Sequence, residues 1–387
     1  MNCHENHCAL LRASLLLAAC TLLTLTGAQT AAAQTNPGAN AIAAYAYVGT
    51  NVSGNGQGYV TDYLISLTGQ SLSTIGSSVS GASGSLAVNS RFVFATDGKN
   101  IVTYTRGANG DLHQTSSVDG TAHNITPQDS SVGSVTLDRT GQTLYADEIN
   151  YDGADDDAYT VWKINSDGSL TYVAPTGISS DYFTPLSFSQ NNVYAYSDGC
   201  YFATWQINGF TRNTNNGTLT SFNPNAAIPP NNNGQMWCPD DLAVSAMNYV
   251  AVDYNDVGNP GNNYLLAMYT LNSDGTLGLV QNSEITTPFN AEHSMAFDPS
   301  GTYLAVAGGM GIQMYRLQTG GMLAPVGSVV DGNVAFNVVR WDNSGHVYAI
   351  SSSALYIFTS SSGVLTQDAG SPLSISQAGS LAILPAQ

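Results

Sequence analysis

The most regular feature of the chain is a short, mostly apolar strand that recurs at intervals of 42 to 56 residues. Self-similarity at such a period is the signature of a repeat architecture, in which each repeat contributes one supersecondary unit. Seven copies of the strand are present, at residues 86–88, 135–137, 186–188, 242–244, 295–297, 339–341 and 381–383. The repeats therefore dominate the organisation of the chain.

Each repeat continues through turns into further strands. Residues 138–141 and 298–301 combine Asp, Ser or Thr with a final Gly and lead into a second apolar strand, which is the composition of a tight hairpin. In the third strand an aromatic residue precedes a turn glycine by six positions, and a fourth strand follows that turn. These aromatic residues are Tyr63, Tyr104, Trp162, Tyr269 and Tyr315. We interpret them as packing between sheets rather than as a ligand site.

Four strands in each repeat of this length are typical of a propeller blade. The last innermost strand, at 381–383, has no partner strands after it, whereas the first repeat, from Tyr45 to about Gly81, lacks an innermost strand. The pattern therefore predicts an all-β fold, a seven-bladed β-propeller with four-stranded blades. The C-terminal strand is expected to close the ring on the first blade, which removes an open sheet edge. Residues 43–387 are expected to form this single domain.

The N-terminal segment has the pattern of a targeting sequence. Arg12 precedes an apolar stretch at 15–25, and three alanines ending at Ala33 form a small-residue cleavage site. We expect a signal peptide over 1–33 and a short linker over 34–42, hence an exported protein, periplasmic or extracellular, with no transmembrane segment after export. Two alternatives stay open: a lipid on Cys20, since 17–20 resembles a lipobox, and an uncleaved anchor.

Removal of the leader leaves two cysteines, Cys200 and Cys238. An oxidising compartment favours one disulfide between them. The strand pattern puts Cys200 in a connection between second and third strands and Cys238 in the following connection between fourth and first strands. Both would lie at the same end of neighbouring blades, which predicts a Cys200–Cys238 bridge. Two separate buried thiols are the alternative.

Composition and charge narrow the range of partners. Only 9% of residues are charged, and the 39 glycines and 21 tyrosines suit strands and tight turns rather than long helices. The formal net charge is −18, with nine Lys and Arg residues in all 387. Nucleic-acid binding needs a basic stripe to release counterions, and an anionic membrane surface attracts basic segments. We therefore exclude both partners.

Candidate chemistry is expected at the mouth of the central channel. The positions two residues before the innermost strands are Gly84, Gly133, Thr184, Asp240, His293, Asn337 and Gly379. Asp240 and His293 belong to adjacent blades, with Glu292 and Asp241 flanking them. An imidazole among carboxylates can act as a general base or as part of a metal site. We predict His293, Asp240 and Glu292 as catalytic residues and Asn337 and Asp241 as ligand-binding residues, the alternative being a structural histidine–carboxylate pair.

No motif predicts a metal or a cofactor. The aspartates of the 152–157 loop could supply oxygen ligands for Ca²⁺ but lack the spacing of a calcium loop, so we interpret them as a solvated acidic loop. The remaining histidines do not have the spacing of a zinc site. A phosphate loop and a dinucleotide fingerprint are also absent from the sequence.

Residues 47–50 (Tyr-Val-Gly-Thr), the phrase at 293–304 and the recurring Asp-Gly-Ser/Thr-Leu turns resemble the lactonase-like seven-bladed propellers. That family includes a 6-phosphogluconolactonase type and a carboxymuconate cycloisomerase. The resemblance spans about residues 43 to 384 and is shared in part with YVTN propellers. It implies histidines at the channel mouth, completed by an arginine and a glutamate. His293 matches one histidine, but Glu292 stands where the family often has arginine, and Gly133 and Ser134 replace another expected histidine.

Two functional classes remain open. The first is a lactone hydrolase, in which His293 activates water and Asp240 or Glu292 orients it. A neutral lactone is expected, because export removes the protein from cytosolic sugar phosphates and an acidic surface repels them. The second is a non-catalytic propeller that binds a small ligand or a protein partner on its long-loop face, the end of the ring where strands two and three, and four and one, are connected.

Overall fold

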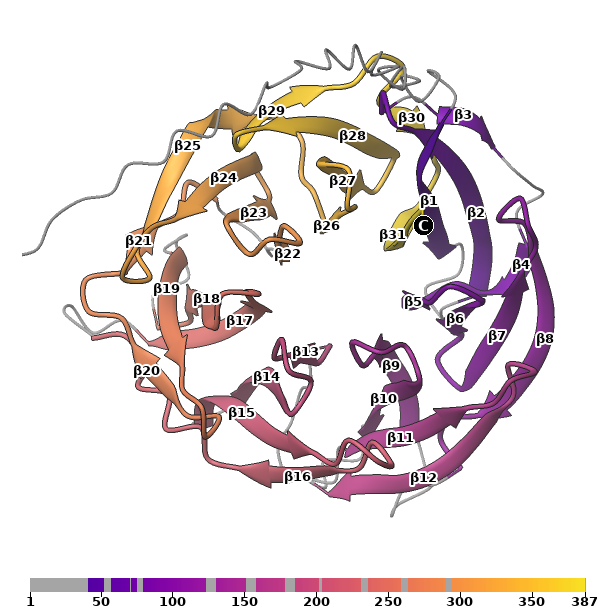
Figure 1. Cartoon of the computed structure of the whole chain (residues 1–387), viewed down its shortest axis with the longest axis horizontal. Helices are drawn as coiled ribbons and strands as arrows, with labels where there is room; N and C mark the ends of the chain where they lie inside the picture. Colours follow the sequence, from indigo (N-terminus) through magenta and orange to yellow (C-terminus); the bar gives the residue numbers. More distant parts are fainter. Residues whose placement is uncertain are drawn as a thin grey trace, which may run out of the picture. The chain divides into compact units, whose positions relative to one another are not determined.

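The computed structural model describes residues 41–51, 57–69, 71–74, 79–122, 130–150, 158–177, 185–201, 204–230, 236–258, 264–289 and 294–386. Within these ranges the regular elements are strands, and they form seven antiparallel sheets arranged around a central axis (Figure 1). The predicted seven-bladed propeller is confirmed. No helix among these residues is long and apolar enough to cross a membrane. The predicted signal peptide at 1–33 lies outside the described residues.

The blades are numbered here from the one that contains the first strand, and each is given from its innermost strand outward. Blade 1 consists of β31 (Ala378–Pro385), β1 (Ile42–Asn51), β2 (Gln57–Ser66), β3 (Ser71–Thr74) and β4 (Val79–Ala82). Blade 2 consists of β5 (Leu86–Val88), β6 (Phe92–Thr96), β7 (Asn100–Arg106) and β8 (Leu112–Asp119). Blade 3 consists of β9 (Ser130–Leu137), β10 (Thr143–Asn150), β11 (Ala158–Ile164) and β12 (Leu170–Gly177).

The other four blades follow the same order. Blade 4 consists of β13 (Ser187–Phe188), β14 (Tyr194–Tyr201), β15 (Thr204–Arg212) and β16 (Leu219–Phe222). Blade 5 consists of β17 (Trp237–Val244), β18 (Tyr249–Asp256), β19 (Tyr264–Leu271), β20 (Leu277–Leu279) and β21 (Ile285–Thr286). Blade 6 consists of β22 (Ser294–Phe297), β23 (Tyr303–Gly308), β24 (Gly311–Leu317) and β25 (Leu323–Val330). Blade 7 consists of β26 (Val338–Trp341), β27 (His346–Ser351), β28 (Ala354–Ser361), β29 (Val364–Gln367) and β30 (Leu373–Ser374).

The outermost strand is divided in three of the blades. In blades 1, 5 and 7 two short strands pair with the same third strand, one after the other along its length. Each pair of short strands occupies the place of one fourth strand. Every blade therefore keeps the arrangement of four successive strand positions that the repeats predict.

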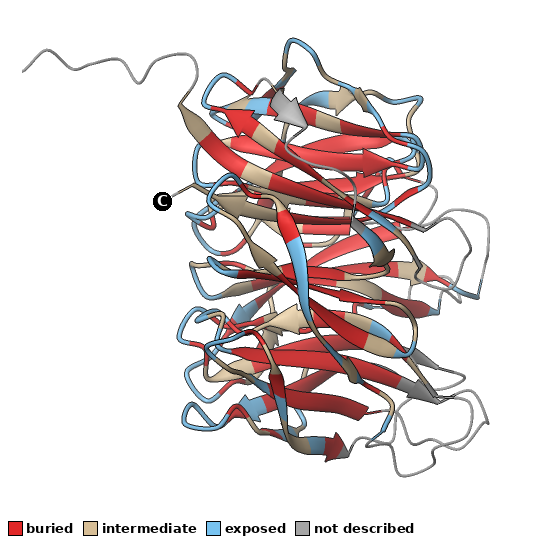
Figure 2. Cartoon of the chain, turned by 90° about the vertical axis from the view of Figure 1, so that its right-hand side faces the viewer, coloured by how far each residue is buried: buried red, intermediate tan, exposed pale blue. Residues whose placement is uncertain are grey.

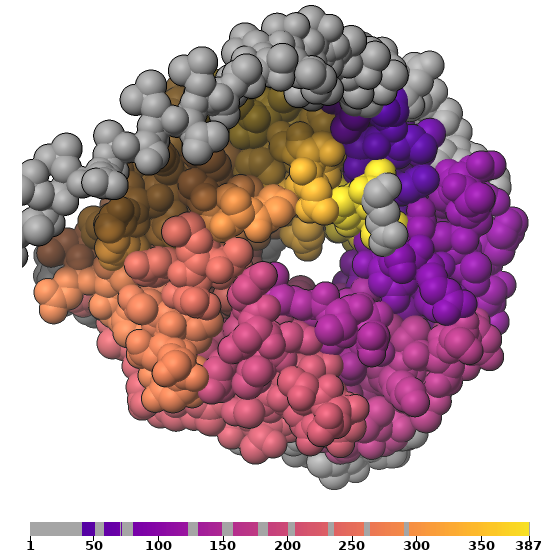
Figure 3. Space-filling model, in the orientation of Figure 1, coloured from indigo at the N-terminus to yellow at the C-terminus, as the bar shows by residue number. Residues whose placement is uncertain are grey.

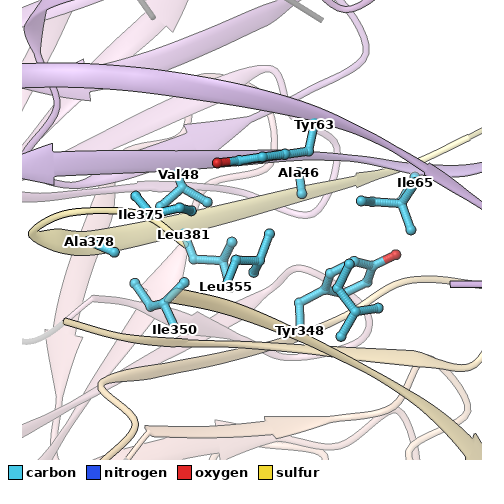
Figure 4. Close-up of a cluster of buried hydrophobic side chains, with 12 residues drawn as sticks. Ala46, Val48, Tyr63, Ile65, Tyr348, Ile350, Leu355, Ile375, Ala378 and Leu381 are labelled. Atoms are coloured by element: carbon cyan, nitrogen blue, oxygen red, sulfur yellow. The ribbon is translucent and has the colours of Figure 1, made fainter. Parts of the chain in front are cut away.

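The ring closes through the last strand of the chain. β31 pairs antiparallel with β1, with Leu381 opposite Val48 and Ile383 opposite Ala46. Figure 4 shows the apolar cluster at this seam, in which side chains of blades 1 and 7 pack around Leu381 and Leu355. The pairing satisfies backbone groups of both strands along their shared edge and covers the inner edge of β1, which would otherwise be open. The closure predicted from the incomplete first and last repeats is confirmed.

Apolar side chains fill the spaces between the blades. Seven buried clusters are present among the described residues, and each joins two neighbouring sheets. Figure 2 shows that the strands are buried over most of their length, whereas exposed residues gather at the turns. The aromatic residues of the third strands all belong to these clusters, which confirms that they pack between sheets. Because both faces of each sheet are covered, few positions tolerate charge.

A second contact between blades recurs around the ring. A buried tyrosine on the second strand of one blade donates a hydrogen bond from its hydroxyl to the carbonyl of a turn glycine in the next blade. The pairs are Tyr47–Gly110 at 3.2 Å, Tyr145–Gly217 at 2.7 Å and Tyr196–Gly275 at 2.7 Å. All three glycines have φ between 80° and 94°, a region that side chains disfavour. These three turn glycines therefore help to join neighbouring blades.

Candidate functional site

The innermost strands enclose a cavity of about 610 Å³ on the axis of the ring. All seven innermost strands contribute to its wall, and Figure 3 shows the opening at the centre of the ring. Most of the wall is apolar, as the alternation of Leu, Val, Met and Ala in these strands requires. A concave, largely apolar site with a few polar groups is the usual form of a small-molecule pocket.

Three charged side chains line this cavity among the described residues: Asp240, Asp241 and Arg340. Asn337 also lies on the wall, so three of the predicted site residues, Asp240, Asp241 and Asn337, are brought together there. Predicted His293 and Glu292 lie outside the described residues. The next residue, Ser294, lines the cavity.

Arg340 was not predicted from the sequence. It is the middle residue of the innermost strand of blade 7, and the other blades have small residues at that position. These residues are Ala87, Thr136, Ser187, Ala243, Ala296 and Ala382. Alignment of the seven repeats would have revealed Arg340, because it is the one charged residue at a position that is otherwise occupied by small side chains. Arg340 lies within the apolar triplet of its repeat, whereas the predicted site residues come from the positions just before these triplets.

The carboxylate of Asp241 also holds two blades together. Its Oδ2 accepts the backbone N–H of Met295 in blade 6 at 2.7 Å, and its Oδ1 accepts the N–H of Leu242 at 2.8 Å. Two other blades make the same contact with serine. Ser85 Oγ accepts the N–H of Val135 at 3.1 Å, and Ser294 Oγ accepts that of Val339 at 3.2 Å. Blade 5 therefore has a charged group where a hydroxyl would be enough for structure.

Burial perturbs both charges on the wall. Loss of solvent, together with the neighbouring charge of Asp198, raises the pKa of Asp241 well above its ordinary value, against the opposing effect of its N–H donors and Arg340. Burial lowers the pKa of Arg340, although the negative charge of Asp241 acts in the other direction. Such desolvated, mutually interacting groups in a cavity are characteristic of functional sites.

The two charges stand at different depths in the channel. In the aligned strands Asp241 corresponds to Val338, so Arg340 is two residues further along the innermost strand. At a rise of roughly 3.3 Å per residue, their backbone positions differ by about 7 Å along the axis. One Arg340 nitrogen, Nη1, donates to the carbonyl of Val339 at 2.8 Å, which anchors the side chain within the channel.

The cysteines lie in strands rather than in the connections that we expected. Cys238 is buried within β17, opposite Asn255, and the backbone of Cys200 belongs to β14, opposite Trp205. The β-ladders extend beyond the limits suggested by the apolar pattern, because backbone pairing does not require apolar side chains. β14 and β17 contact each other across the boundary of blades 4 and 5. The side chain of Cys200 lies outside the described residues, and the Cys200–Cys238 bridge stays a prediction.

Within the described part of the chain, no three His, Cys, Asp or Glu side chains are grouped as a metal site. The acidic 152–157 loop lies outside the described residues, so its calcium binding is untested.

No protein-family model matches the chain, and no curated protein matches it. Solved structures do. A putative 6-phosphogluconolactonase from Bacteroides fragilis superimposes with a TM-score of 0.66 at 18% identity, covering 90% of this chain and 99% of its own. A second putative 6-phosphogluconolactonase, from Bacteroides uniformis, gives 0.65 at 16% identity, with coverages of 88% and 99%. A protein from Lactobacillus plantarum gives 0.64 at 14%, with coverages of 89% and 100%. At these identities the likeness shows the fold, which is the one that the resemblance in the sequence implies.

Proposed function

We propose that the axial cavity binds a neutral lactone and hydrolyses it to the open hydroxy acid. The observation that carries the proposal is the presence of two aspartates and one desolvated arginine on a mostly apolar wall. A lactone combines a carbon ring with one ester group, which matches a wall of this kind. The likeness to propellers described as putative 6-phosphogluconolactonases supports the same reaction class.

The reaction needs a base, an oxyanion partner and a proton for the leaving oxygen. Water attacks the carbonyl carbon while its proton passes to the base, for which we propose His293, oriented by Asp240 or Glu292. Arg340 stabilises the negative charge that develops on the carbonyl oxygen. Its electrostatic interaction with that oxygen is strengthened because the site excludes most solvent. The bond from the carbonyl carbon to the ring oxygen then breaks, and the ring oxygen takes the proton from the protonated base.

The charge of the wall favours an uncharged substrate. Two carboxylates and one guanidinium line the cavity among the described residues, and the chain as a whole carries −18. A phosphorylated lactone would meet an unfavourable potential both on approach and at the site. Asp241 is suited instead to accept hydrogen bonds from hydroxyl substituents of a neutral ring, and Asn337 can both donate to and accept from them.

The test is a hydrolysis assay with a panel of neutral and phosphorylated lactones, in which turnover is measured by the acid that is released. We expect turnover of at least one neutral lactone, with His293→Ala and Arg340→Gln each reducing kcat/KM by 100-fold or more. Arg316→Gln is the matched control, because Arg316 is exposed on β24, the third strand of blade 6, and is not among the residues that line the cavity. Full activity of Arg340→Gln would exclude its role in the reaction.

The same panel separates catalysis from binding alone. If calorimetry shows saturable binding of lactones that are never hydrolysed, and Arg340→Gln weakens it, the cavity is a binding site of a non-catalytic propeller. If no lactone binds or reacts, the proposed function is wrong.

A further inference from the structure

A second and larger hollow, of about 1070 Å³, is built by blades 2, 3 and 4. Its wall is made by the turns between first and second strands, such as 138–142, and between third and fourth strands, such as 163–166. The innermost strands run toward these turns from the end that carries Asp240 and Asn337. The cleft therefore opens at the opposite end of the ring, and it meets the axial cavity only at Val88 and Leu137.

The cleft gathers the basic residues of an acidic chain. Four of the nine Lys and Arg residues line it, whereas Asp138 is the one carboxylate among its described lining residues. The four basic residues are Arg91, Arg139, Lys163 and Arg212. With 27 acidic residues in the chain, this local excess of positive charge is contrary to the overall balance.

Among the described residues, a carboxylate neutralises one of the four basic side chains. Arg212 Nη2 donates to Asp138 Oδ2 at 2.7 Å, and both side chains are buried. In the described part of the chain, no carboxylate forms an ion pair with Arg91, Arg139 or Lys163. The described lining residues of the cleft therefore carry an excess of three positive charges.

Neutral groups hold two of these cations in place. Arg139 donates from Nε at 3.0 Å and from Nη2 at 2.9 Å to the carbonyl of Phe188, and burial lowers its pKa. Arg91 donates to the carbonyl of Ser166 and lies over the ring of Phe92, 4.9 Å from its centre. Such contacts fix a guanidinium without cancelling its charge, which leaves the charge available to a ligand.

The four cations belong to one connected wall. Asn192 donates to Asp138 at 2.9 Å and accepts the backbone N–H of Arg139 at 3.2 Å. Arg212 also donates to the hydroxyl of Thr143 at 3.1 Å, and Lys163 stands opposite Thr143 on the neighbouring strand. Lys163 is exposed and its side chain forms no hydrogen bond or ion pair with another described residue, so its ammonium group can reach a ligand.

Exposed amide side chains complete the lining, namely Gln142, Asn191, Asn215 and Asn216. An amide both donates and accepts hydrogen bonds, which is what vicinal hydroxyl groups require. A wall of cations and amides is complementary to a molecule that has an anionic group and several hydroxyls.

We propose that this cleft binds a small polyhydroxylated anion, a sugar acid or a sugar phosphate, with its anionic group between Lys163, Arg91 and Arg139. The site is separate from the channel and does not depend on lactone hydrolysis. Both ligand types share the chemistry of one anionic group on a hydroxylated ring.

Calorimetry on the purified protein at low ionic strength tests the proposal, with glucuronate, glucose 1-phosphate, inorganic phosphate and glucose as probes. We expect saturable binding of glucuronate or glucose 1-phosphate and none of glucose. The anion that binds more tightly shows whether the cleft prefers a carboxylate or a phosphate group. Lys163→Gln and Arg91→Gln should each weaken binding tenfold or more without lowering the thermal midpoint by more than a few degrees.

Lys99→Gln is the matched control, since it removes the same charge from an exposed residue that pairs with Asp119 in blade 2. It should change affinity by less than twofold. Equal weakening by Lys99→Gln would show a non-specific effect of net charge and overturn the proposal. Binding that is lost in Arg340→Gln but kept in Lys163→Gln would place the ligand in the channel, and inorganic phosphate binding as tightly as glucose 1-phosphate would overturn the role of the hydroxyls.

Discussion

Asp241 Oδ2 accepts the backbone N–H of Met295 at 2.7 Å, across the boundary between blades 5 and 6. One side chain thus joins two blades and places a carboxylate on the channel wall. Serine makes the equivalent contact from Ser85 and Ser294. The structural and the chemical roles of this residue can therefore be separated by substitution.

Asp241→Ser should preserve the ring and impair the channel. We expect its free energy of unfolding to stay within about 1 kcal/mol of the original, because a hydroxyl still accepts the N–H of Met295. Asp241→Val should lose about 1–3 kcal/mol, since that buried donor is left without an acceptor. Urea denaturation measures both, and equal stabilities of the two variants would show that the hydrogen bond contributes little. Both substitutions should reduce ligand binding in the channel.

The closing strand should be essential to the whole ring. Leu381 is 2% exposed within the seam of blades 1 and 7, so Leu381→Ala should cost about 2–5 kcal/mol. Val364→Ala, at a position 50% exposed on β29, is the control and should change stability by under about 0.5 kcal/mol. Truncation after Pro372 removes β31 completely and should lower the thermal midpoint further. An unchanged midpoint in the truncated chain would refute closure.

The Cys200–Cys238 bridge should be measurable in the oxidised protein. We expect no free thiol in the chain lacking its leader, by labelling under denaturing conditions. Because the bridge would close a loop of 37 intervening residues, Cys238→Ser should cost roughly 3–4 kcal/mol in the chain-entropy estimate. Reducing agent should lower the stability of the original protein but leave that of Cys238→Ser unchanged. Two labelled thiols in the oxidised protein would contradict the bridge.

His346 should make stability depend on pH above its ordinary titration range. Burial alone would lower its pKa, but the hydrogen bond from its Nδ1 to Asp342 Oδ2 at 2.7 Å and the charges of Asp342 and Asp368 together raise it. A raised pKa means that the folded state holds the proton more tightly than the unfolded chain. The contribution of this proton to the free energy of unfolding is therefore complete below about pH 6.5 and is lost as the pH rises through the folded-state pKa.

The measurement is the thermal midpoint from pH 6 to pH 9. The original protein should lose more stability over this range than His346→Gln does. His113→Gln is the control, because it removes an exposed imidazole from blade 2 and leaves the hydrogen bond between His346 and Asp342 intact. Parallel profiles for the original protein and His346→Gln would rule out this proton as a source of stability.

The local pattern of the chain determined the fold. Recurring apolar triplets, aromatic residues at a fixed distance from a turn glycine, and two incomplete end repeats were sufficient to predict seven closed blades. Such features report on residues that are neighbours in sequence, and most strands within a blade pair with the next strand along the chain. The pairing of β31 with β1 is the exception, and it followed from the two incomplete end repeats. The burial of Tyr104 and Tyr269 between sheets followed from the same pattern.

Part of the candidate site also followed from sequence position. Asp240, Asp241 and Asn337 line the channel. They were predicted from their positions just before the apolar triplets of their repeats, which form the channel wall. The cysteines were placed at the correct end but in the wrong elements, since side-chain polarity does not mark where backbone pairing stops.

Only the tertiary structure decided which charges meet. Asp241 and Arg340 influence each other although almost a hundred positions separate them, and Arg91, Arg139 and Lys163 come to one cleft from two blades. These encounters depend on how many blades close the ring and on how each is rotated against the next. The interaction between two charges depends on their distance in space and on the water between them, and a linear pattern specifies neither.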